Sequence, residues 1–237
     1  MFYIIGLGLN EKGISAEGKT ALKKCHKVYL ENYTIEFPYK LEKLEKLLGK
    51  KVKLLNRDDV ENNKIIFESK KKNTALLIYG SPFFATTHIT LIKECIDNEI
   101  EYKIIYSSSV FEAVAESGLQ LYKFGKIASM PKWEKNFKPD SFVEIIKENR
   151  SINAHSLILI DIGLSFNNAI DQLIKSSKTK NFEIENILVC SQLGFNSKFY
   201  YGKINRLKNK KIKAPFCFVI PGKMHFLEEE ILKIYEI

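Results

Sequence analysis

The chain has 237 residues, of which 45% are hydrophobic and 27% charged, and its formal net charge is +9. This length and hydrophobic content allow one large or two medium packed domains, so we expect a soluble globular protein. No apolar run approaches the roughly 20 residues of a membrane-spanning helix, and the first residues lack the features of a secretory signal peptide. We therefore expect a cytoplasmic protein without a membrane segment.

The first 106 residues alternate predicted strands with predicted helices. Strands are expected at residues 2–8, 27–31, 52–55, 74–79 and 102–106. Helices are expected at residues 16–24, 39–48, from 58 onward and at 89–97. Ser15 is the predicted N-cap of the first helix, and Thr86 or Thr87 that of the last. This alternation predicts a mostly parallel sheet.

The pattern changes after the serine run at 107–109, which precedes a helix containing Val110 and Leu119. We place a domain boundary between about residues 107 and 122. The predicted fold class is α/β, with two tandem α/β domains at residues 1–110 and 111–237. Further strands are expected at 126–130, 155–162, 186–192, 198–204 and 217–220. Further helices are expected at 141–148, near 167–176 and from about 224.

Two lysine-rich runs, residues 70–72 and 208–213, carry the densest positive charge. A basic surface favours acidic partners, including RNA or ribonucleoprotein-associated proteins. Such runs are more often solvated helix faces or turns, and no RNA-binding motif accompanies them. We therefore expect no direct binding to nucleic acid.

The cysteines and histidines stand singly in the sequence. The cysteines are Cys25, Cys95, Cys190 and Cys217. With no close pair and no histidine at ligand spacing, neither a disulfide framework nor a metal site is predicted. Only His88 and His225 lie beside glycine-proline loops, and we interpret both as capping or packing residues rather than general bases.

Small residues lie at the ends of three predicted strands, at 6–8, 80–82 and 107–109. The carboxyl ends of parallel strands meet at one edge of a sheet, so these loops suggest one shared pocket for a polar small molecule. Tight strand-to-helix packing and helix capping are the alternative interpretations. A dinucleotide fingerprint is disfavoured, because its third glycine is replaced by Glu11, and no P-loop sequence occurs.

The sequence lacks the parts of several common catalytic sites. No G-x-S-x-G elbow, no HExxH motif and no compact set of carboxylates with histidines occurs, so hydrolase and metal mechanisms are disfavoured. A transfer that depends on positioning fits better. Methyl transfer from a sulfonium is such a reaction, because its leaving group is already activated. We assign no catalytic residue.

Several segments resemble those of the diphthine synthase family, S-adenosylmethionine-dependent methyltransferases of the tetrapyrrole-methylase-like class. These segments are IIGLGLNEKGIS, KKCHKVYLENYT, LLNRDDVE, GSPFFATTH, SSSVFEAV followed by GLQLYKFGK, and VIPGKMHFLE. The correspondence extends over nearly the whole chain.

The resemblance implies a homodimer of two-domain chains, with S-adenosylmethionine in the cleft between the domains. The implied partner is translation elongation factor 2, whose modified histidine is methylated on the amino group of its 3-carboxyl-3-aminopropyl chain during diphthamide biosynthesis. Matched positions imply donor contacts at or near Leu9, Ser81, Phe84, Ser109, Val110, Ile160, Leu193 and Phe216.

Three departures from the family pattern leave alternatives open. The family usually has aspartate where Ser81 stands, the region after Ile162 is shortened, and residues 191–195 differ from its small-residue pattern. A carboxylate at position 81 could accept hydrogen bonds from the donor, which Ser81 does less strongly. The alternatives are methylation of a tetrapyrrole or corrin by the same fold, and a non-catalytic scaffold that has lost donor contacts.

Overall fold

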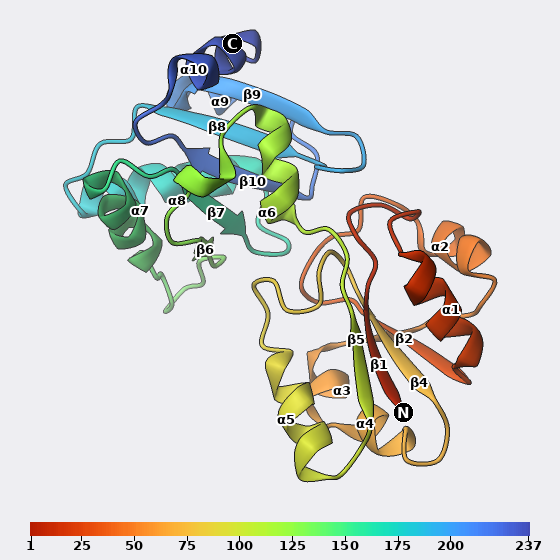
Figure 1. Cartoon of the computed structure of the whole chain (residues 1–237). Helices are drawn as coiled ribbons and strands as arrows, with labels where there is room; N and C mark the ends of the chain where they lie inside the picture. Colours follow the sequence, from red (N-terminus) through yellow and green to blue (C-terminus); the bar gives the residue numbers. More distant parts are fainter. The chain divides into compact units, whose positions relative to one another are not determined.

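The computed structural model describes all 237 residues and divides into two compact units, Met1–Val110 and Phe111–Ile237 (Figure 1). Each unit is built on its own five-stranded sheet, with helices packed against it. The predicted α/β class is confirmed in both units.

The sheet of the first unit is entirely parallel, in the order β3-β2-β4-β1-β5. Its strands are β1 Phe2–Gly6, β2 Lys27–Glu31, β3 Lys53–Leu55, β4 Thr74–Ile78 and β5 Tyr102–Ile105. The parallel sheet confirms the prediction from strand and helix alternation. Since β1 lies between β4 and β5, the carboxyl ends of these three strands are neighbours.

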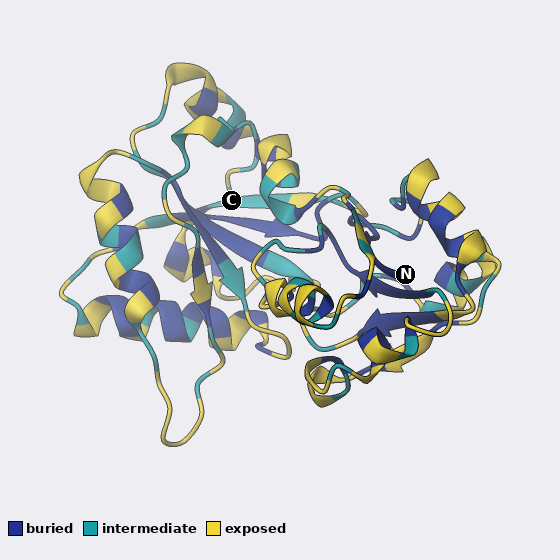
Figure 2. Cartoon of the chain, turned by 60° about the horizontal axis from the view of Figure 1, so that its bottom comes forward, coloured by how far each residue is buried: buried dark blue, intermediate teal, exposed yellow.

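Five helices accompany this sheet: α1 Ala16–Lys24, α2 Leu41–Leu48, α3 Arg57–Glu61, α4 Lys64–Glu68 and α5 Ile89–Asp97. Alternate residues of β1 point to opposite faces. Phe2 and Ile4 join the hydrophobic cluster formed with α3, α4 and α5. On the other face, a side chain at Gly18 of α1 would meet Ile5, so α1 packs closely there. The buried strands and exposed outer helix faces are visible in Figure 2.

One predicted helix cap is confirmed and another is wrong. The Ser15 hydroxyl accepts a hydrogen bond from the Gly18 amide at 3.0 Å, as an N-cap does. At α5 the N-cap position is His88, not Thr86 or Thr87, and no side chain caps the helix. The Thr86 hydroxyl instead accepts from the His88 amide at 3.0 Å, within the turn that precedes the helix.

The sheet of the second unit is mixed, in the order β6-β7-β10-β8-β9. Its strands are β6 Ala128–Met130, β7 Ser156–Ile160, β8 Asn186–Ser191, β9 Lys198–Lys203 and β10 Phe216–Ile220. Only β6 and β7 pair in parallel, and the other pairs are antiparallel. Its core includes Phe142 of α7 (Ser141–Ser151), Leu173 of α8 (Phe166–Thr179) and Phe218 of β10.

The helix predicted to run from Val110 through Leu119 is shorter. The helix α6 spans Val110–Ala113, and a 3-10 turn continues to Ser117. Gly118 then adopts a left-handed conformation with φ of 89°, and a side chain there would lie 2.5 Å from Ile231. The left-handed Gly118 therefore ends the helical segment, and the close approach of Ile231 of α10 (Phe226–Ile234) leaves no room for a side chain at this position. A second 3-10 turn at Leu121–Lys123 and the helix α9 (Ile204–Leu207) complete the unit.

All four cysteines are free and buried. No helix combines the length and the apolar character needed to cross a membrane.

Candidate functional site

The loops after β1 and β4 are joined by reciprocal backbone hydrogen bonds. The Gly8 amide donates to the Gly80 carbonyl at 3.2 Å, and the Gly80 amide donates to the Gly8 carbonyl at 3.0 Å. The loop after β5 joins through the Ser107 hydroxyl, which donates to the Gly13 carbonyl at 3.0 Å. The three loops singled out in the sequence therefore lie together at one edge of the first sheet.

Glycine is required where these loops approach each other most closely. A Cβ atom at Gly6 would lie 2.6 Å from the Gly80 carbonyl oxygen, and one at Gly8 would lie 2.9 Å from the Ser107 hydroxyl. Gly80 differs, because a Cβ there would meet nothing closer than 3.8 Å. A Cβ atom at Gly80 would thus make only ordinary van der Waals contacts, with Ser108 and Ser109, so the packing there is looser than at Gly6 and Gly8.

The predicted donor residues of the first unit lie on these loops. Leu9 follows β1, Ser81 and Phe84 follow β4, and Ser109 and Val110 follow β5. Leu9 and Ser109 are buried, whereas the other three are half-buried. The cluster combines apolar side chains with hydroxyls and backbone amides and carbonyls, as a site for a ligand with apolar and polar parts requires.

Two contacts that the sequence did not predict fix the loop after β1. The Tyr79 hydroxyl donates to the Leu9 carbonyl at 2.7 Å. Burial raises the pKa of Tyr79, so the hydroxyl keeps its proton. Glu11, which is buried, forms an ion pair with Lys43, and the hydrogen bond from Lys43 lowers the pKa of Glu11. A tyrosine directly before the glycine-proline loop was the available sequence signal for the first contact.

The three remaining predicted residues lie at one end of the second sheet. Phe216 starts β10 opposite Ser191, the last residue of β8, and Leu193 follows two residues later. The next pair along β10 is Cys217 with Leu159, so Ile160 at the end of β7 lies at the same end. Ile160 and Phe216 are partly buried against the hydrophobic core, so packing alone also accounts for their apolar character.

The two histidines beside glycine-proline loops have structural partners. His225 occupies the N-cap of α10, where its Nδ1 accepts from the Leu227 amide. His88 is 2% exposed, and its Nδ1 lies 3.2 Å from the Pro82 carbonyl oxygen. The interpretation of His225 as a capping residue is confirmed, and His88 packs beneath the loop after β4.

A buried carboxylate connects two of the family segments within the second unit. Glu228 is 1% exposed and accepts hydrogen bonds from the Gln120 amide at 2.9 Å, the His225 amide at 2.7 Å and the side chains of Lys123 and His155. Burial opposes ionisation, but these hydrogen bonds outweigh it and lower the pKa of Glu228 to about 2. The YKFGK and PGKMHFLE segments therefore form one structural unit around this carboxylate.

The orientation of His155 is fixed by both of its ring nitrogens. Its Nδ1 accepts from the Gly222 amide at 2.9 Å, so Nε2 carries the proton and donates to Glu228 at 3.1 Å. Burial lowers the pKa of His155, which keeps the ring neutral.

Comparisons with known proteins agree with this architecture. The family of Tetrapyrrole (Corrin/Porphyrin) Methylases matches residues 1–207. A diphthine synthase of Methanococcus maripaludis is 37% identical over 249 residues, which cover 98% of each chain. A diphthine methyl ester synthase of Schizosaccharomyces pombe is 42% identical over 165 residues, which cover 68% of this chain and 58% of its own.

A solved crystal structure of a diphthine synthase has a TM-score of 0.89 and 30% sequence identity, and the match covers 99% of this chain and 95% of that one. The family match spans most of the chain, and the M. maripaludis relative matches it nearly end to end. The chain therefore belongs to the diphthine synthase family, S-adenosylmethionine-dependent methyltransferases of diphthamide biosynthesis within the tetrapyrrole methylase class.

Proposed function

We propose that this protein transfers methyl groups from S-adenosylmethionine to the amino group of the modified histidine in translation elongation factor 2. The observation that carries the proposal is the cluster of three strand-end loops in the first unit, joined at Gly8 and Gly80. The homodimer that the family resemblance implies, and the cytoplasmic location expected from the sequence, are part of the proposal.

The residues of the cluster fit the chemistry of the donor. Gly80 carries no side chain, and the packing around its Cβ position is looser than at Gly6 and Gly8. Leu9 and Phe84 provide apolar surface for a purine ring, and Ser81 and Ser109 provide hydroxyls for ribose or amino-acid groups. The contacts implied for Ile160, Leu193 and Phe216 remain predictions.

The chain itself supplies binding and orientation. The bound sulfonium carries a methyl group that is already activated for transfer. The Gly8–Gly80 hydrogen bonds and the Tyr79 contact hold the loops that orient the donor. Correct positioning of two reactants accounts for a large part of the rate of such a transfer.

A second candidate product is supported by the fission yeast relative. Its name denotes a methyl ester, in which a carboxyl oxygen accepts the methyl group, and it is 42% identical to this chain over the matched region. An ester differs from a methylated amine because base hydrolyses it. Mass measurement before and after base treatment therefore separates the two products.

Donor binding provides the first test. Calorimetry of the full chain should show binding of both S-adenosylmethionine and S-adenosylhomocysteine. Phe84→Ala is expected to weaken binding by about tenfold, because an aromatic contact contributes roughly 1–2 kcal/mol. Phe67→Ala removes an exposed phenylalanine of α4 in the same unit and should leave the affinity unchanged. Absence of heat with either ligand would instead support a scaffold without donor binding.

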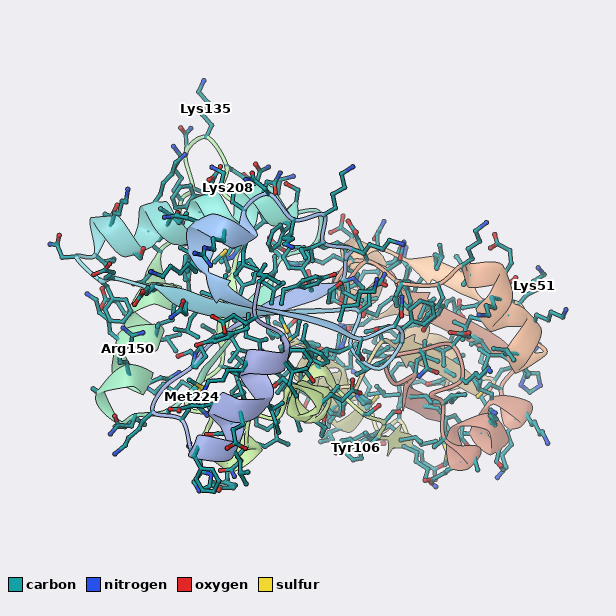
Figure 3. All side chains as sticks on the ribbon, turned by 90° about the horizontal axis from the view of Figure 1, so that it is seen from above. Lys51, Tyr106, Lys135, Arg150, Lys208 and Met224 are labelled. Atoms are coloured by element: carbon teal, nitrogen blue, oxygen red, sulfur yellow. The ribbon has the colours of Figure 1, made fainter.

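A strongly basic segment supports a protein partner. Residues 186–227 contain eight lysines and arginines and no aspartate or glutamate. Two of these cations form ion pairs, Lys203 with Glu185 and Lys208 with Asp171. Lys208 is labelled in Figure 3, and residues 210, 211 and 213 after it are exposed. The Ser191 hydroxyl donates to the Lys213 carbonyl at 2.7 Å, so this run adjoins the end of the second sheet that carries Phe216.

Charge reversal of this run tests its role. The triple variant K210E/K211E/K213E is expected to raise the KM for elongation factor 2 by about tenfold at low salt, with kcat and donor affinity unchanged, because removing attraction slows association. The matched control is K70E/K71E/K72E, which reverses the other lysine run. Equal effects of the two triple variants would contradict a specific contact.

A further inference from the structure

A buried carboxylate with an unsatisfied oxygen lies beneath the loop after β4. Glu31, the last residue of β2, is fully buried. Its Oε1 accepts a hydrogen bond from the Thr34 hydroxyl, whereas its Oε2 has no hydrogen-bond partner. The atom lies 4.0 Å from Nε2 of His88. Burying an unpaired carboxylate oxygen is costly, so packing alone does not explain a glutamate here.

The proton positions on His88 follow from its neighbours. Nδ1 lies 3.2 Å from the Pro82 carbonyl oxygen, which can only accept, so Nδ1 carries a hydrogen. In the neutral ring Nε2 is then an acceptor, and the Tyr33 hydroxyl lies 3.2 Å from it. Burial lowers the pKa of His88, which favours the neutral ring. Nε2 has a single lone pair, which accepts the hydrogen bond from the Tyr33 hydroxyl while Glu31 is ionised, so the free oxygen of Glu31 faces a nitrogen that offers it no hydrogen.

One additional proton gives the free oxygen of Glu31 a hydrogen bond. Burial raises the pKa of Glu31 to about 7, although the Thr34 hydrogen bond opposes the shift. A protonated Glu31 carboxyl can donate to Nε2 of His88 in place of the Tyr33 hydroxyl once the two atoms approach to about 2.8 Å. Because Nδ1 of the same ring is bonded to Pro82, such a movement acts on the loop that contains Ser81.

Other ionisable groups near the pair come from two elements. Tyr33, in the segment after β2, has its pKa raised to about 12 by burial and by the charges of Glu31 and Glu61, and Arg57 opposes this shift. Arg57 of α3 lies 5.5 Å from the centre of the Tyr33 ring. Tyr33 therefore stays protonated at neutral pH, and because its side chain is half-buried, the hydroxyl can bond to water when Glu31 replaces it at Nε2.

We propose that Glu31 and His88 share a proton, and that this proton holds the Gly80–His88 loop in the conformation that binds the methyl donor. Both are positioning residues, since neither is placed in contact with the donor. The inference rests on the proposed function only for the identity of that donor.

The test compares donor affinity at pH 6 and pH 8. In the unmodified protein the affinity for S-adenosylmethionine should fall by about tenfold as the pH rises, because the shared proton is lost. E31Q should bind equally tightly at both pH values, because its amide can donate to His88 without a proton. A change in the protonation of S-adenosylmethionine between the two pH values affects both proteins equally, so it cancels when the affinity of E31Q is divided by that of the unmodified protein. E31L should bind weakly at both values.

A control and a second measurement separate positioning from general stability. Tyr29→Phe, on the same strand, removes a hydroxyl bonded to Glu68 and should keep the pH profile of the unmodified protein. The amide resonances of residues 80–88, measured without donor, should titrate near pH 7 in the unmodified protein and not in E31Q. If the amide resonances of the loop titrate but the protein does not bind the donor, the proposed function is refuted and the shared proton is not. If E31Q and the unmodified protein show parallel pH profiles of donor affinity, or if the loop resonances do not titrate, the proposal of a shared proton is refuted.

Discussion

Gly6→Ala is expected to weaken donor binding by at least about 100-fold, a loss of roughly 2.7 kcal/mol. The new Cβ would lie 2.6 Å from the Gly80 carbonyl oxygen, 3.0 Å from Pro82 Cδ and 3.1 Å from Ser107 Cβ. The nearest atom is backbone, so no side-chain rotation relieves the overlap. The loops after β1 and β4 must separate, which breaks the hydrogen bonds between Gly8 and Gly80.

The same change should lower the free energy of unfolding by about 1–3 kcal/mol, as overpacking of a buried site does. The control is Gly49→Ala, at the carboxyl end of α2, where φ is 64° and no atom lies within 4 Å of the added Cβ. Gly49→Ala should lower the free energy of unfolding by about 1 kcal/mol, because alanine disfavours the left-handed backbone conformation, and it should leave donor affinity intact. Calorimetry and thermal unfolding measure both quantities. Tight donor binding by Gly6→Ala would contradict the placement of the donor at these loops.

Glu228→Gln is expected to destabilise the protein by about 3 kcal/mol at pH 7. Its carboxylate is 1% exposed and accepts hydrogen bonds from Lys123, Gln120, His225 and His155. An amide removes the negative charge and leaves the Lys123 ammonium, which is 21% exposed, without its ionic partner. Breaking a buried pair by changing one partner typically costs several kcal/mol.

The pH dependence of this effect has a defined sign. The pKa of Glu228 falls from 4.5 to about 2 on folding, so its ionised form stabilises the native state fully above about pH 4.5, and this contribution is lost as the pH falls towards 2. Urea unfolding should be measured from pH 7 to pH 3. The difference in the free energy of unfolding between E228Q and the unmodified protein should become smaller below about pH 4.5. The control is Glu230→Gln on the exposed side of α10. If the difference in the free energy of unfolding stays constant at all pH values, the role of the Glu228 charge is contradicted.

Local patterns were sufficient to predict most of the first unit. Buried apolar runs that end in glycine, such as β1 and β4, and the Ser15 cap depend on interactions within a few residues. The helix predicted from residue 58 onward is divided into α3 and α4 by Asn63, whose φ is 60°. The helix α9 was not predicted, because a segment of four residues is too short to show helical periodicity. The mixed sheet of the second unit depends on long-range pairing that the local sequence does not specify.

The candidate site was predictable only in part. Strand-end loops of a parallel sheet must adjoin, and the Gly8–Gly80 bridge confirms this expectation. The contacts of Tyr79 with Leu9, and of Glu31 with His88, join residues 57 to 70 positions apart and follow from the fold alone. The donor contacts in the second unit were inferred from family resemblance, and no local pattern indicates them.

Methyl transfer to elongation factor 2 is the decisive assay for the proposed function. The purified chain, S-adenosylmethionine and elongation factor 2 carrying the 3-carboxyl-3-aminopropyl histidine would be combined, and the modified peptide measured by mass spectrometry before and after base treatment. We expect successive additions of one methyl group to that histidine, strongly reduced with Gly6→Ala at a limiting donor concentration and retained with Gly49→Ala. An unmodified peptide from a chain that binds the donor, or methylation of a tetrapyrrole instead, would contradict the proposed function.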